Sequence, residues 1–372
     1  MDKTIYFFCT TQGSPATAYF QSASIALAQG LRVLGMPYFA NVDYWRMSAD
    51  EDDYLFKKTP SVHFTDCDIV VVDSQMVLRT GKLPEGLFSP SRKYATVYLD
   101  RNDGIVTHSW NPLFREFDLI LKTHFNYRLN FPGNIRPWAY GLCDHMMETA
   151  RGTLEYTNRQ PRILWNFRVN HPVRLFAKKH LMPLLDPVLA LDGRTDELDQ
   201  PDSTENYNFI LYQQTGRRFY PRYYEQLREA AACACFCGYF VHPKIDRVWT
   251  VVNSRYFLRV VSELIARGAG PKRFMQWPLL SWDSWRLWEA MAAGCVVVHV
   301  DFEKHGIELP RMPVNWQHYI GVDFEHVEDT VARLQAEPDI LAKISANGAE
   351  FARTHYSPFA TAKRFLGLAA GM

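Results

Sequence analysis

The sequence lacks the features that mark several common classes of protein. Its 41 Lys and Arg residues are nearly balanced by 40 Asp and Glu residues, which leaves a formal net charge of +1. A nucleic-acid-binding protein usually concentrates basic residues on one face, and the sequence has no such basic stripe. No apolar stretch approaches the roughly 20 residues that cross a membrane as a helix. The composition therefore gives no strong nucleic-acid signal and no transmembrane segment.

Targeting signals and a cysteine framework are absent as well. Residues 1–4 lead into a brief apolar run, 5–9, which has the length of a strand and not of a signal peptide, so we expect a cytoplasmic protein. The 7 cysteines are scattered, apart from Cys233, Cys235 and Cys237, whose alternation is typical of a packed strand. We therefore expect neither a disulfide framework nor a metal site, and we find no internal repeat or low-complexity tract.

The chain is long and apolar enough to form two domains. It has 372 residues, 47% of them hydrophobic, which can bury two substantial cores. Strand-like runs alternate with helical ones, the pattern of a parallel sheet with helices on both faces. The fold class predicted is α/β, with two Rossmann-like domains at 1–150 and 151–355 and a C-terminal helix, 356–372, that could pack back on the first domain. The predicted strands are 3–9, 66–73, 94–99, 117–122, 163–168, 187–191 and 234–237. The predicted helices are 18–34, 172–181, 223–232, 325–335, 339–355 and 358–368. Residues 143–161 are predicted to form a linker between the two domains.

Residues 281–300, in the second half, contain the main candidate functional residues. Ser284 is suited to begin a helix by accepting hydrogen bonds from its first amides, and Gly294 to end it in the left-handed conformation. Arg286 and Glu289 then share one face near the helix start. A helix start and an adjacent arginine bind phosphate oxygens, and a glutamate accepts hydrogen bonds from sugar hydroxyls. The segment fits a nucleotide diphosphate-sugar site; the alternative is an amphipathic helix with a surface salt bridge.

The second half resembles the exostosin-like glycosyltransferases over roughly residues 160–350. The resemblance rests on the strand and basic residue at 163–168, the helix and small-residue strand at 224–238, the segment 284–295, and the Leu-Pro segment and following strand at 307–320. It implies the GT-B fold, with an inter-domain cleft between two Rossmann-like domains. It also implies an acceptor-binding first domain and a donor-binding second domain.

The resemblance implies transfer of a sugar from a nucleotide diphosphate-sugar donor to a carbohydrate or other hydroxyl-bearing acceptor. Arg286, the amides at Ser284 and Arg168 would stabilise the leaving phosphate, and Glu289 would hold the ribose or the donor sugar. No metal or other cofactor is implied, because arginine and the helix dipole can replace a cation. Asp66-Cys67-Asp68 has the Asp-x-Asp pattern of a metal-binding pair. It precedes the apolar strand instead of following it, so we interpret it as a turn.

The sequence also departs from the family pattern. The broader GT-B motif has two acidic residues eight positions apart, and Ser281 occupies the first of these places if Glu289 is the second. Sugar recognition could therefore differ. The segment 239–281 is longer than expected and could shape an acceptor or partner surface with Trp249, Arg255, Arg259 and Trp277.

A general base is needed if the reaction inverts the configuration at the sugar, and is not needed if it retains it. The candidates are Asp100, Asp103, Asp73 and His124, because each stands at a predicted strand end; Asp100 is the first choice and His124 the histidine candidate. The sequence does not decide between the two outcomes.

Two other functions fit the same architecture. A nucleotide-sugar epimerase would change the sugar without an acceptor. A non-catalytic protein that binds a sugar or a nucleotide would keep the fold without the chemistry, and the absence of an acidic residue at Ser281 favours it.

Overall fold

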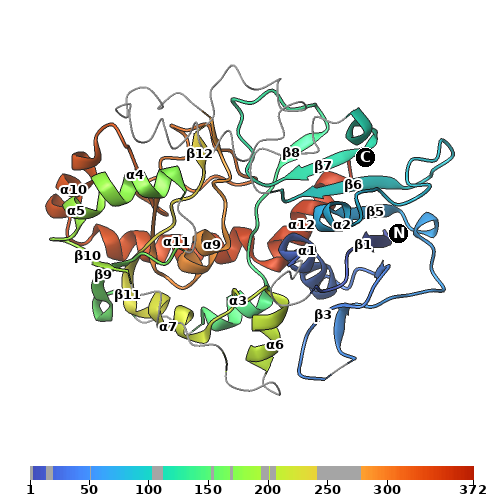
Figure 1. Ribbon diagram of the computed structural model, residues 1–372, viewed down its shortest axis with the longest axis horizontal. Coiled ribbons are helices and arrows are strands. Elements are labelled where there is room, and N and C mark those ends of the chain that lie inside the picture. The colour runs from blue at the N-terminus through green and yellow to red at the C-terminus, as the bar shows by residue number, and fades with distance from the viewer. Residues whose placement is uncertain are drawn as a thin grey trace.

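The computed structural model describes residues 3–13, 20–50, 52–102, 112–151, 155–167, 171–193, 201, 207–240 and 278–372. These residues form two α/β halves placed side by side, each built on one parallel sheet (Figure 1). None of the helices in the described ranges combines the length and the apolar character that a membrane crossing requires.

The N-terminal half is a six-stranded sheet in which every neighbouring pair is parallel. Its order is β2 (Tyr38–Ala40), β1 (Ile5–Phe8), β5 (Ile69–Asp73), β6 (Ala95–Asp100), β7 (Leu119–Lys122) and β8 (Ile135–Pro137). Helix α1 (Ser22–Val33) follows β1 and helix α2 (Ser74–Thr80) follows β5. The two crossovers run in opposite directions along the sheet, so their right-handed geometry places α1 and α2 on opposite faces. A small hairpin, β3 (Tyr44–Arg46) and β4 (Tyr54–Phe56), and the 3-10 turns η1 (Phe64–Asp66) and η3 (Pro112–Glu116) complete this half.

The C-terminal half is a five-stranded parallel sheet. Its order is β10 (Ala190–Asp192), β9 (Gln160–Leu164), β11 (Ala230–Ala234), β14 (Val296–Val300) and β15 (Ile320–Val322). The surrounding helices are α4 (Pro172–His180), α5 (Met182–Leu185), α6 (Tyr207–Gln214), α7 (Pro221–Glu229), α9 (Trp285–Ala292), α10 (Val327–Ala336) and α11 (Ile340–Tyr356). Strands β12 (Tyr239–Phe240) and β13 (Leu279–Leu280) form a short antiparallel pair.

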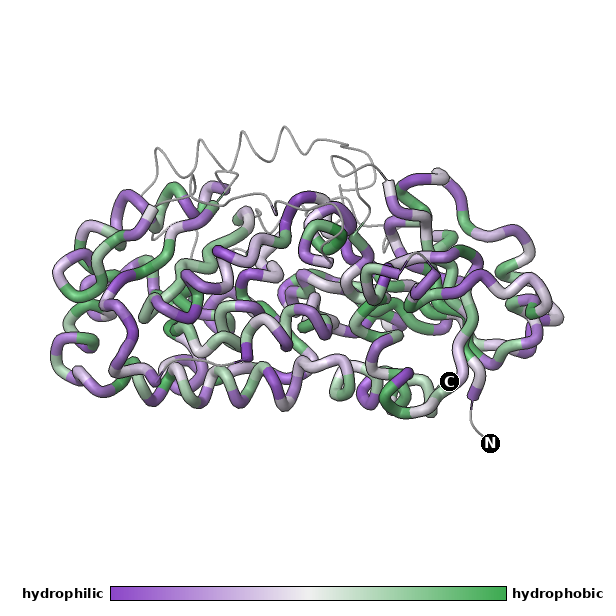
Figure 2. Tube along the Cα trace, turned by 90° about the horizontal axis from the view of Figure 1, so that it is seen from below, coloured by the Kyte–Doolittle hydropathy of each residue, from purple (hydrophilic) through white to green (hydrophobic). Residues whose placement is uncertain are grey.

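The chain crosses between the halves twice. The first crossing contains α3 (Asp144–Thr149) and the turn η4 (Tyr156–Asn158), and the second leads from α11 into α12 (Pro358–Ala369). Helix α12 packs on α1 of the first half, where a Cβ on Gly30 would lie 2.0 Å from the carbonyl oxygen of Pro358. Lys3 donates a hydrogen bond of 3.0 Å from Nζ to the Ala369 carbonyl, and the C-terminal end of the chain lies on the side of the N-terminal sheet, near β1 (Figures 1 and 2).

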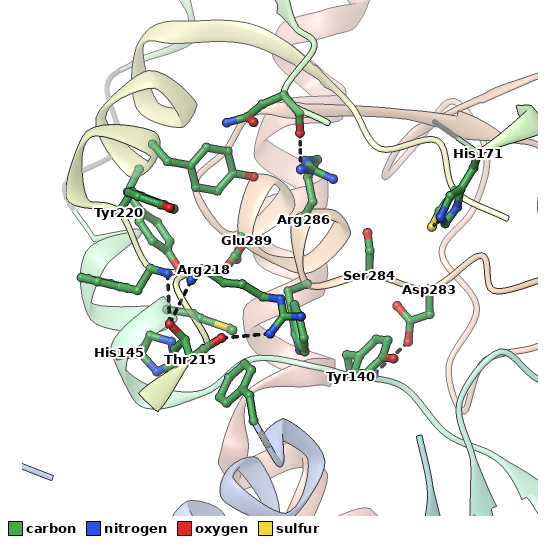
Figure 3. Close-up of a pocket in the computed structure, with 18 of the residues that line it drawn as sticks. Tyr140, His145, His171, Thr215, Arg218, Tyr220, Asp283, Ser284, Arg286 and Glu289 are labelled. Carbon is green, nitrogen blue, oxygen red and sulfur yellow. Dashed lines mark hydrogen bonds between the residues drawn. The ribbon is translucent and has the colours of Figure 1, made fainter. Parts of the chain in front are cut away.

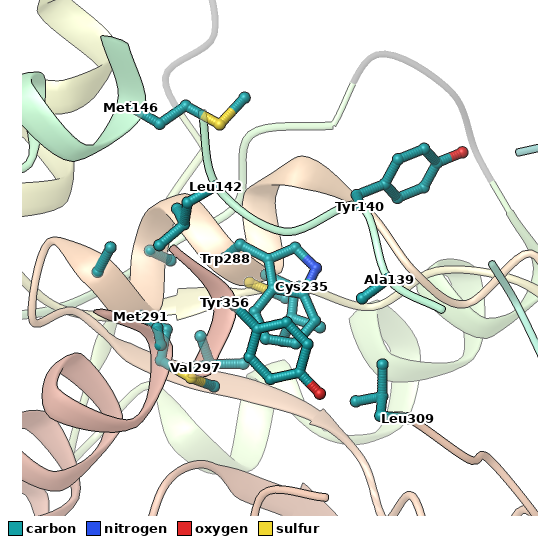
Figure 4. Packing of buried hydrophobic residues seen from close by; sticks show 14 of the residues in the cluster. Ala139, Tyr140, Leu142, Met146, Cys235, Trp288, Met291, Val297, Leu309 and Tyr356 are labelled. Carbon is teal, nitrogen blue, oxygen red and sulfur yellow. The ribbon is translucent and has the colours of Figure 1, made fainter. Parts of the chain in front are cut away.

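The hydrophobic core is continuous across the junction. One cluster of buried residues includes members of both sheets, such as Val71 of β5 and Val297 of β14. Figure 4 shows Leu142 of the first crossing beside Trp288 of α9 and Tyr356 at the end of α11. The Trp288 and Tyr356 rings are 3.9 Å apart between centroids, so aromatic packing joins α9 to the start of the second crossing.

Most predicted elements are confirmed, and several differ in their bounds: the strand predicted at 163–168 is β9, Gln160–Leu164, and the helix predicted at 223–232 is α7, Pro221–Glu229. The strand expected at 234–237 is instead β11, Ala230–Ala234, which starts directly after α7 ends at Glu229; there the Arg159 guanidinium donates to the carbonyls of Leu227 and Ala230. The predicted linker, 143–161, connects the two halves as expected, and it also contains α3, which at six residues is too short to show a helical period.

Two other expectations from the sequence agree with the structure. All 7 cysteines are free and buried, as core packing requires. Asp66 and Asp68 form a turn before β5: a carboxylate oxygen of Asp66 accepts from the His63 amide at 3.0 Å, and one of Asp68 accepts from the Thr4 amide at 2.7 Å.

Candidate functional site

A cavity of about 330 Å³ lies where the two halves meet. Figure 3 shows His171 on one side of it and His145, Thr215 and Tyr220 on the other, with Ser284, Arg286 and Glu289 between them. Its walls come from the start of α1, the first crossing, and the segments around α4, α7 and α9. The residues that line it are Phe20, Tyr140, His145, Met146, Asn166, His171, Arg174, Thr215, Arg218, Phe219, Tyr220, Tyr223, Tyr224, Cys237, Asp283, Ser284, Trp285, Arg286 and Glu289.

The start of α9 is exposed to this cavity, and the helix has the bounds that the sequence predicts. Ser284 is its N-cap residue, with φ −157° and ψ 153°. Gly294 ends it at φ +70°, with hydrogen bonds from its own amide to the Met291 carbonyl at 3.0 Å and from the Cys295 amide to the Ala290 carbonyl at 2.9 Å. This pair of bonds is the Schellman motif, which a glycine makes without strain.

The predicted cap by the Ser284 side chain is wrong. Its hydroxyl oxygen is buried and makes no hydrogen bond within the described ranges, because the side chain does not turn back to the helix amides. The carboxylate of Asp283 accepts from the Ser284 amide instead. The cavity-facing start of α9 therefore keeps an unpaired hydroxyl in addition to its dipole.

Arg286 points its guanidinium into the cavity wall at the end of β9. One of its terminal nitrogens donates to the carbonyl of Asn166, and its Cζ lies 4.6 Å from the centre of the Phe167 ring. The Nε atom is buried and makes no hydrogen bond to the described part of the chain. The contacts fix the side chain in place and leave donor capacity for an anion.

Glu289 lies one turn further along α9 and is 8% exposed. Its Oε1 accepts a hydrogen bond of 2.7 Å from the Tyr224 hydroxyl, and burial raises the pKa of the carboxyl to about 7. It forms no ion pair with Arg286, so the alternative of a surface salt bridge does not describe these residues. Within the described ranges the other carboxylate oxygen has no partner, which leaves it for a ligand hydroxyl.

Two further arginines line the cavity. The Nε of Arg174, near the start of α4, donates to the Phe236 carbonyl at 2.7 Å, and its Cζ lies 4.1 Å from the Phe167 ring centre. Phe167 thus contacts both Arg174 and Arg286. Arg218 lies with its Cζ 5.2 Å from the Trp285 ring centre. Three guanidinium groups around two carboxylates make the cavity suited to a ligand that carries more than one negative charge.

Aromatic side chains form the part of the cavity wall near the start of α7. The Phe20 and Trp285 ring centroids are 5.0 Å apart, and the His145 ring lies 5.8 Å from that of Phe219. Burial lowers the pKa of His145 to about 3, so its imidazole is neutral at physiological pH. Planar apolar walls with a neutral imidazole fit a planar heterocycle.

Asp283 stands directly before the N-cap residue and is 3% exposed. Its Oδ2 accepts from the Tyr140 amide and its Oδ1 from the Trp288 indole, each at 2.8 Å. Burial raises the pKa of its carboxyl to about 7.

Asp100 and His124, proposed from the sequence as catalytic residues, lie outside the cavity lining. Asp100 is fully buried, its Oδ2 is 3.2 Å from Lys122 Nζ, and its Oδ1 accepts from the Asn102 amide at 3.1 Å. The Nδ1 of His124 accepts from the Asp283 amide at 3.0 Å, and its Nε2 lies 3.3 Å from the Tyr140 hydroxyl. Their catalytic roles stay predictions.

Several residues of the sequence-based hypotheses cannot be placed. Arg168, predicted to bind the donor, lies outside the described residues, as do Asp103 and the side chains Trp249, Arg255, Arg259 and Trp277. Ser281 is 1% exposed and does not line the cavity.

The sequence did not identify Asp283, Arg174, Arg218 and His145 as site residues. Asp283 adjoins the predicted helix start and could have been found as a residue near the N-cap. The other three had no local signal, because each reaches the cavity from an element distant in sequence.

No protein-family model matches the chain, and no curated protein matches its sequence. Solved structures do match its fold. An alpha-glucosyltransferase in complex with UDP and a 13-mer DNA containing a HMU base has a TM-score of 0.53 at 11% sequence identity, with 100% of both chains covered. An alpha-glucosyltransferase in complex with UDP and a 13-mer DNA containing a central A:G mismatch has a TM-score of 0.52 at 13% sequence identity, with 99% of this chain and 100% of that chain covered. AviGT4, a glycosyltransferase involved in avilamycin A biosynthesis, gives 0.51 at 13%, covering 100% and 99%. The chain therefore has the GT-B fold, with two Rossmann-like domains whose parallel sheets face an inter-domain cleft.

Proposed function

We propose that this protein is a glycosyltransferase that moves a sugar from a nucleoside diphosphate-sugar to an acceptor hydroxyl, in the manner of the exostosin-like enzymes that its second half resembles. The observation that carries the proposal is the start of α9. The Ser284 hydroxyl, which is unpaired among the described residues, meets a partly buried arginine and a buried glutamate there in an inter-domain cavity. Similar folds solved with UDP support it.

The diphosphate would lie at the start of α9. There the helix dipole and the guanidinium of Arg286 attract the phosphate oxygens, and the hydroxyl of Ser284 can donate to them. Arg174 contacts the same Phe167 ring as Arg286 and adds a second positive charge. In a cavity shielded from water these fixed charges act strongly on the leaving phosphate, because they need not reorganise.

The nucleoside would extend from the diphosphate toward α7. Glu289 would accept hydrogen bonds from the ribose hydroxyls, since one of its oxygens has no partner in the described ranges. The base would then reach the aromatic side of the cavity, between Phe219 and Trp285, where planar surfaces favour stacking.

We propose a metal-independent transfer, because guanidinium groups and the helix dipole provide the positive charge that a divalent ion provides in other enzymes. Transfer that persists in EDTA would agree with this proposal. A complete loss of transfer that Mg²⁺ or Mn²⁺ restores would contradict it.

The general base, if one is used, is not assigned to Asp100 or His124. Both side chains have hydrogen-bond partners inside the protein and neither lines the cavity. Sequence reasoning chose them because strand ends meet at one edge of a sheet, and that argument does not fix which way a side chain turns.

The proposed function is tested by titrating the protein with UDP, GDP, ADP and TDP in a calorimeter, and then by incubation with the matching nucleotide sugars. Binding of a nucleoside diphosphate, with slow hydrolysis of one nucleotide sugar when no acceptor is present, is the expected result. A changed sugar on an intact nucleotide would instead identify an epimerase. Binding without any hydrolysis or transfer, across a panel of carbohydrate acceptors, would indicate a non-catalytic protein.

A further inference from the structure

The segment that leads into α9 is attached to the other half of the molecule. The indole nitrogen of Trp282 donates to the Phe125 carbonyl at 3.2 Å, and the Asp283 amide donates to His124 Nδ1 at 3.0 Å. The indole nitrogen of Trp285 donates to the Ser22 hydroxyl at 2.9 Å. Each of these partners belongs to the N-terminal half, so that half determines where the start of α9 lies.

Two residues at this junction have an unfavourable backbone conformation. His124 has φ +56° and Ser281 has φ +54°, and neither is a glycine. Backbone strain of this kind persists only where surrounding contacts enforce it, and it is concentrated at functional sites. The hydrogen bond between His124 and Asp283 connects the two strained segments.

Asp283 has the central position in this junction. Its carboxylate accepts from the Tyr140 amide, which belongs to the first crossing, and from the indole of Trp288 on α9. Trp288 packs on Tyr356 at the second crossing, and the Tyr356 carbonyl accepts from the Leu142 amide at 2.9 Å. One buried side chain thus connects α9 to both points where the chain passes between the halves (Figures 3 and 4).

We propose that Asp283 is a positioning residue that couples the donor site to the relative arrangement of the two halves. The inference rests on the proposed function only in naming a nucleoside diphosphate as the ligand. When the carboxylate holds Tyr140 and Trp288 together, the start of α9 faces the cavity with Ser284 and Arg286 in place. When the halves separate, the Tyr140 amide withdraws, and the start of α9 loses its support.

The groups around Asp283 show why its carboxylate suits this role. The titratable side chains that face it across the junction are His124, whose Nδ1 already accepts from the Asp283 amide, and the hydroxyl of Tyr356. No cation forms an ion pair with Asp283 within the described ranges. The carboxylate is therefore held by N–H donors, and the one from the first crossing, the Tyr140 amide, is lost when the halves move apart.

The test is Asp283→Asn, which keeps the side-chain shape but has one oxygen for the N–H donors of Tyr140, Trp288 and Ser284. Two quantities are measured: the dissociation constant of UDP by calorimetry, and the radius of gyration by small-angle X-ray scattering, with and without UDP. We expect UDP binding to weaken about tenfold or more, the scale of a lost hydrogen bond to a charged group. We also expect a larger radius of gyration that UDP partly reverses.

Asp118→Asn is the matched control. Asp118 is exposed on the surface of the N-terminal half, where its Oδ2 accepts from the Thr96 amide at 2.7 Å, away from the junction. A loss of general stability would appear in both variants as a lower melting temperature. Only the junction variant should change the UDP affinity and the radius of gyration.

Trp288→Phe is the second variant, and it tests the proposed coupling if Asp283→Asn does not fold. It removes the indole donor, leaves the Tyr140 contact, and should give a smaller change of the same sign in both measurements. Wild-type UDP affinity and radius of gyration in the folded variants would overturn the proposal. If the wild-type protein binds none of UDP, GDP, ADP and TDP, the proposed function fails, and the scattering comparison still tests the coupling.

Discussion

Replacing Arg286 by alanine is the most direct test of the donor site. The guanidinium is held by the Asn166 carbonyl and the Phe167 ring before any ligand binds, so little side-chain entropy is lost on binding. A hydrogen bond to a charged group contributes about 1.5–3 kcal/mol. Each 1.4 kcal/mol is a factor of ten, so the dissociation constant of the bound nucleoside diphosphate should rise roughly 10- to 150-fold.

The assay is a calorimetric titration with UDP, or with whichever nucleoside diphosphate the wild-type protein prefers, at fixed ionic strength. Arg286→Lys should give an intermediate value, because it keeps the charge but not the bidentate geometry. Arg333→Ala is the control, since Arg333 lies outside the cavity and pairs with Glu337 on the surface. An Arg286→Ala protein that folds and binds within twofold of wild type would remove Arg286 from the site and refute the reasoning.

Three further predictions follow from particular side chains. The raised pKa of Glu289, about 7, means that its carboxyl is protonated below neutral pH, whereas ribose hydroxyls bind the carboxylate. Nucleotide affinity should therefore rise from pH 6 to pH 8, and Glu289→Gln should flatten this rise, since the titration of the nucleotide itself is common to both proteins. The same raised pKa means that the folded state binds the proton more tightly than the unfolded state. Stability should accordingly fall from pH 5 to pH 8, with a smaller fall in Glu289→Gln thermal melts. Gly30→Ala should destabilise the protein by about 1–3 kcal/mol in urea unfolding, because the new Cβ would overlap the Pro358 carbonyl between α1 and α12. Gly367→Ala, which meets nothing within 4 Å, should be neutral or stabilising, and equal effects of the two changes would contradict the packing argument.

The sequence determined the elements whose signal is local. The apolar run of β5 is buried along its whole length, and α9 lies between Ser284 and Gly294 as predicted, although only Gly294 caps the helix in the way that the sequence indicated. Arg286 and Glu289 were found because helix geometry alone brings residues three apart onto one face. The alternation of strand-like and helical runs is also a local signal, and it was sufficient to predict two parallel sheets.

Only the tertiary structure decided which side chains reach the cavity and which are paired elsewhere. His145, Arg174 and Arg218 come from three distant segments, and no local pattern records that they meet. Asp100 and His124 stand at strand ends as expected. However, Asp100 pairs with Lys122 and accepts from the Asn102 amide, and His124 accepts from the Asp283 amide. Periodicity specifies which face of an element is buried. The partner across a domain junction depends on contacts between residues far apart in the chain, and these form only when both halves have folded and packed together.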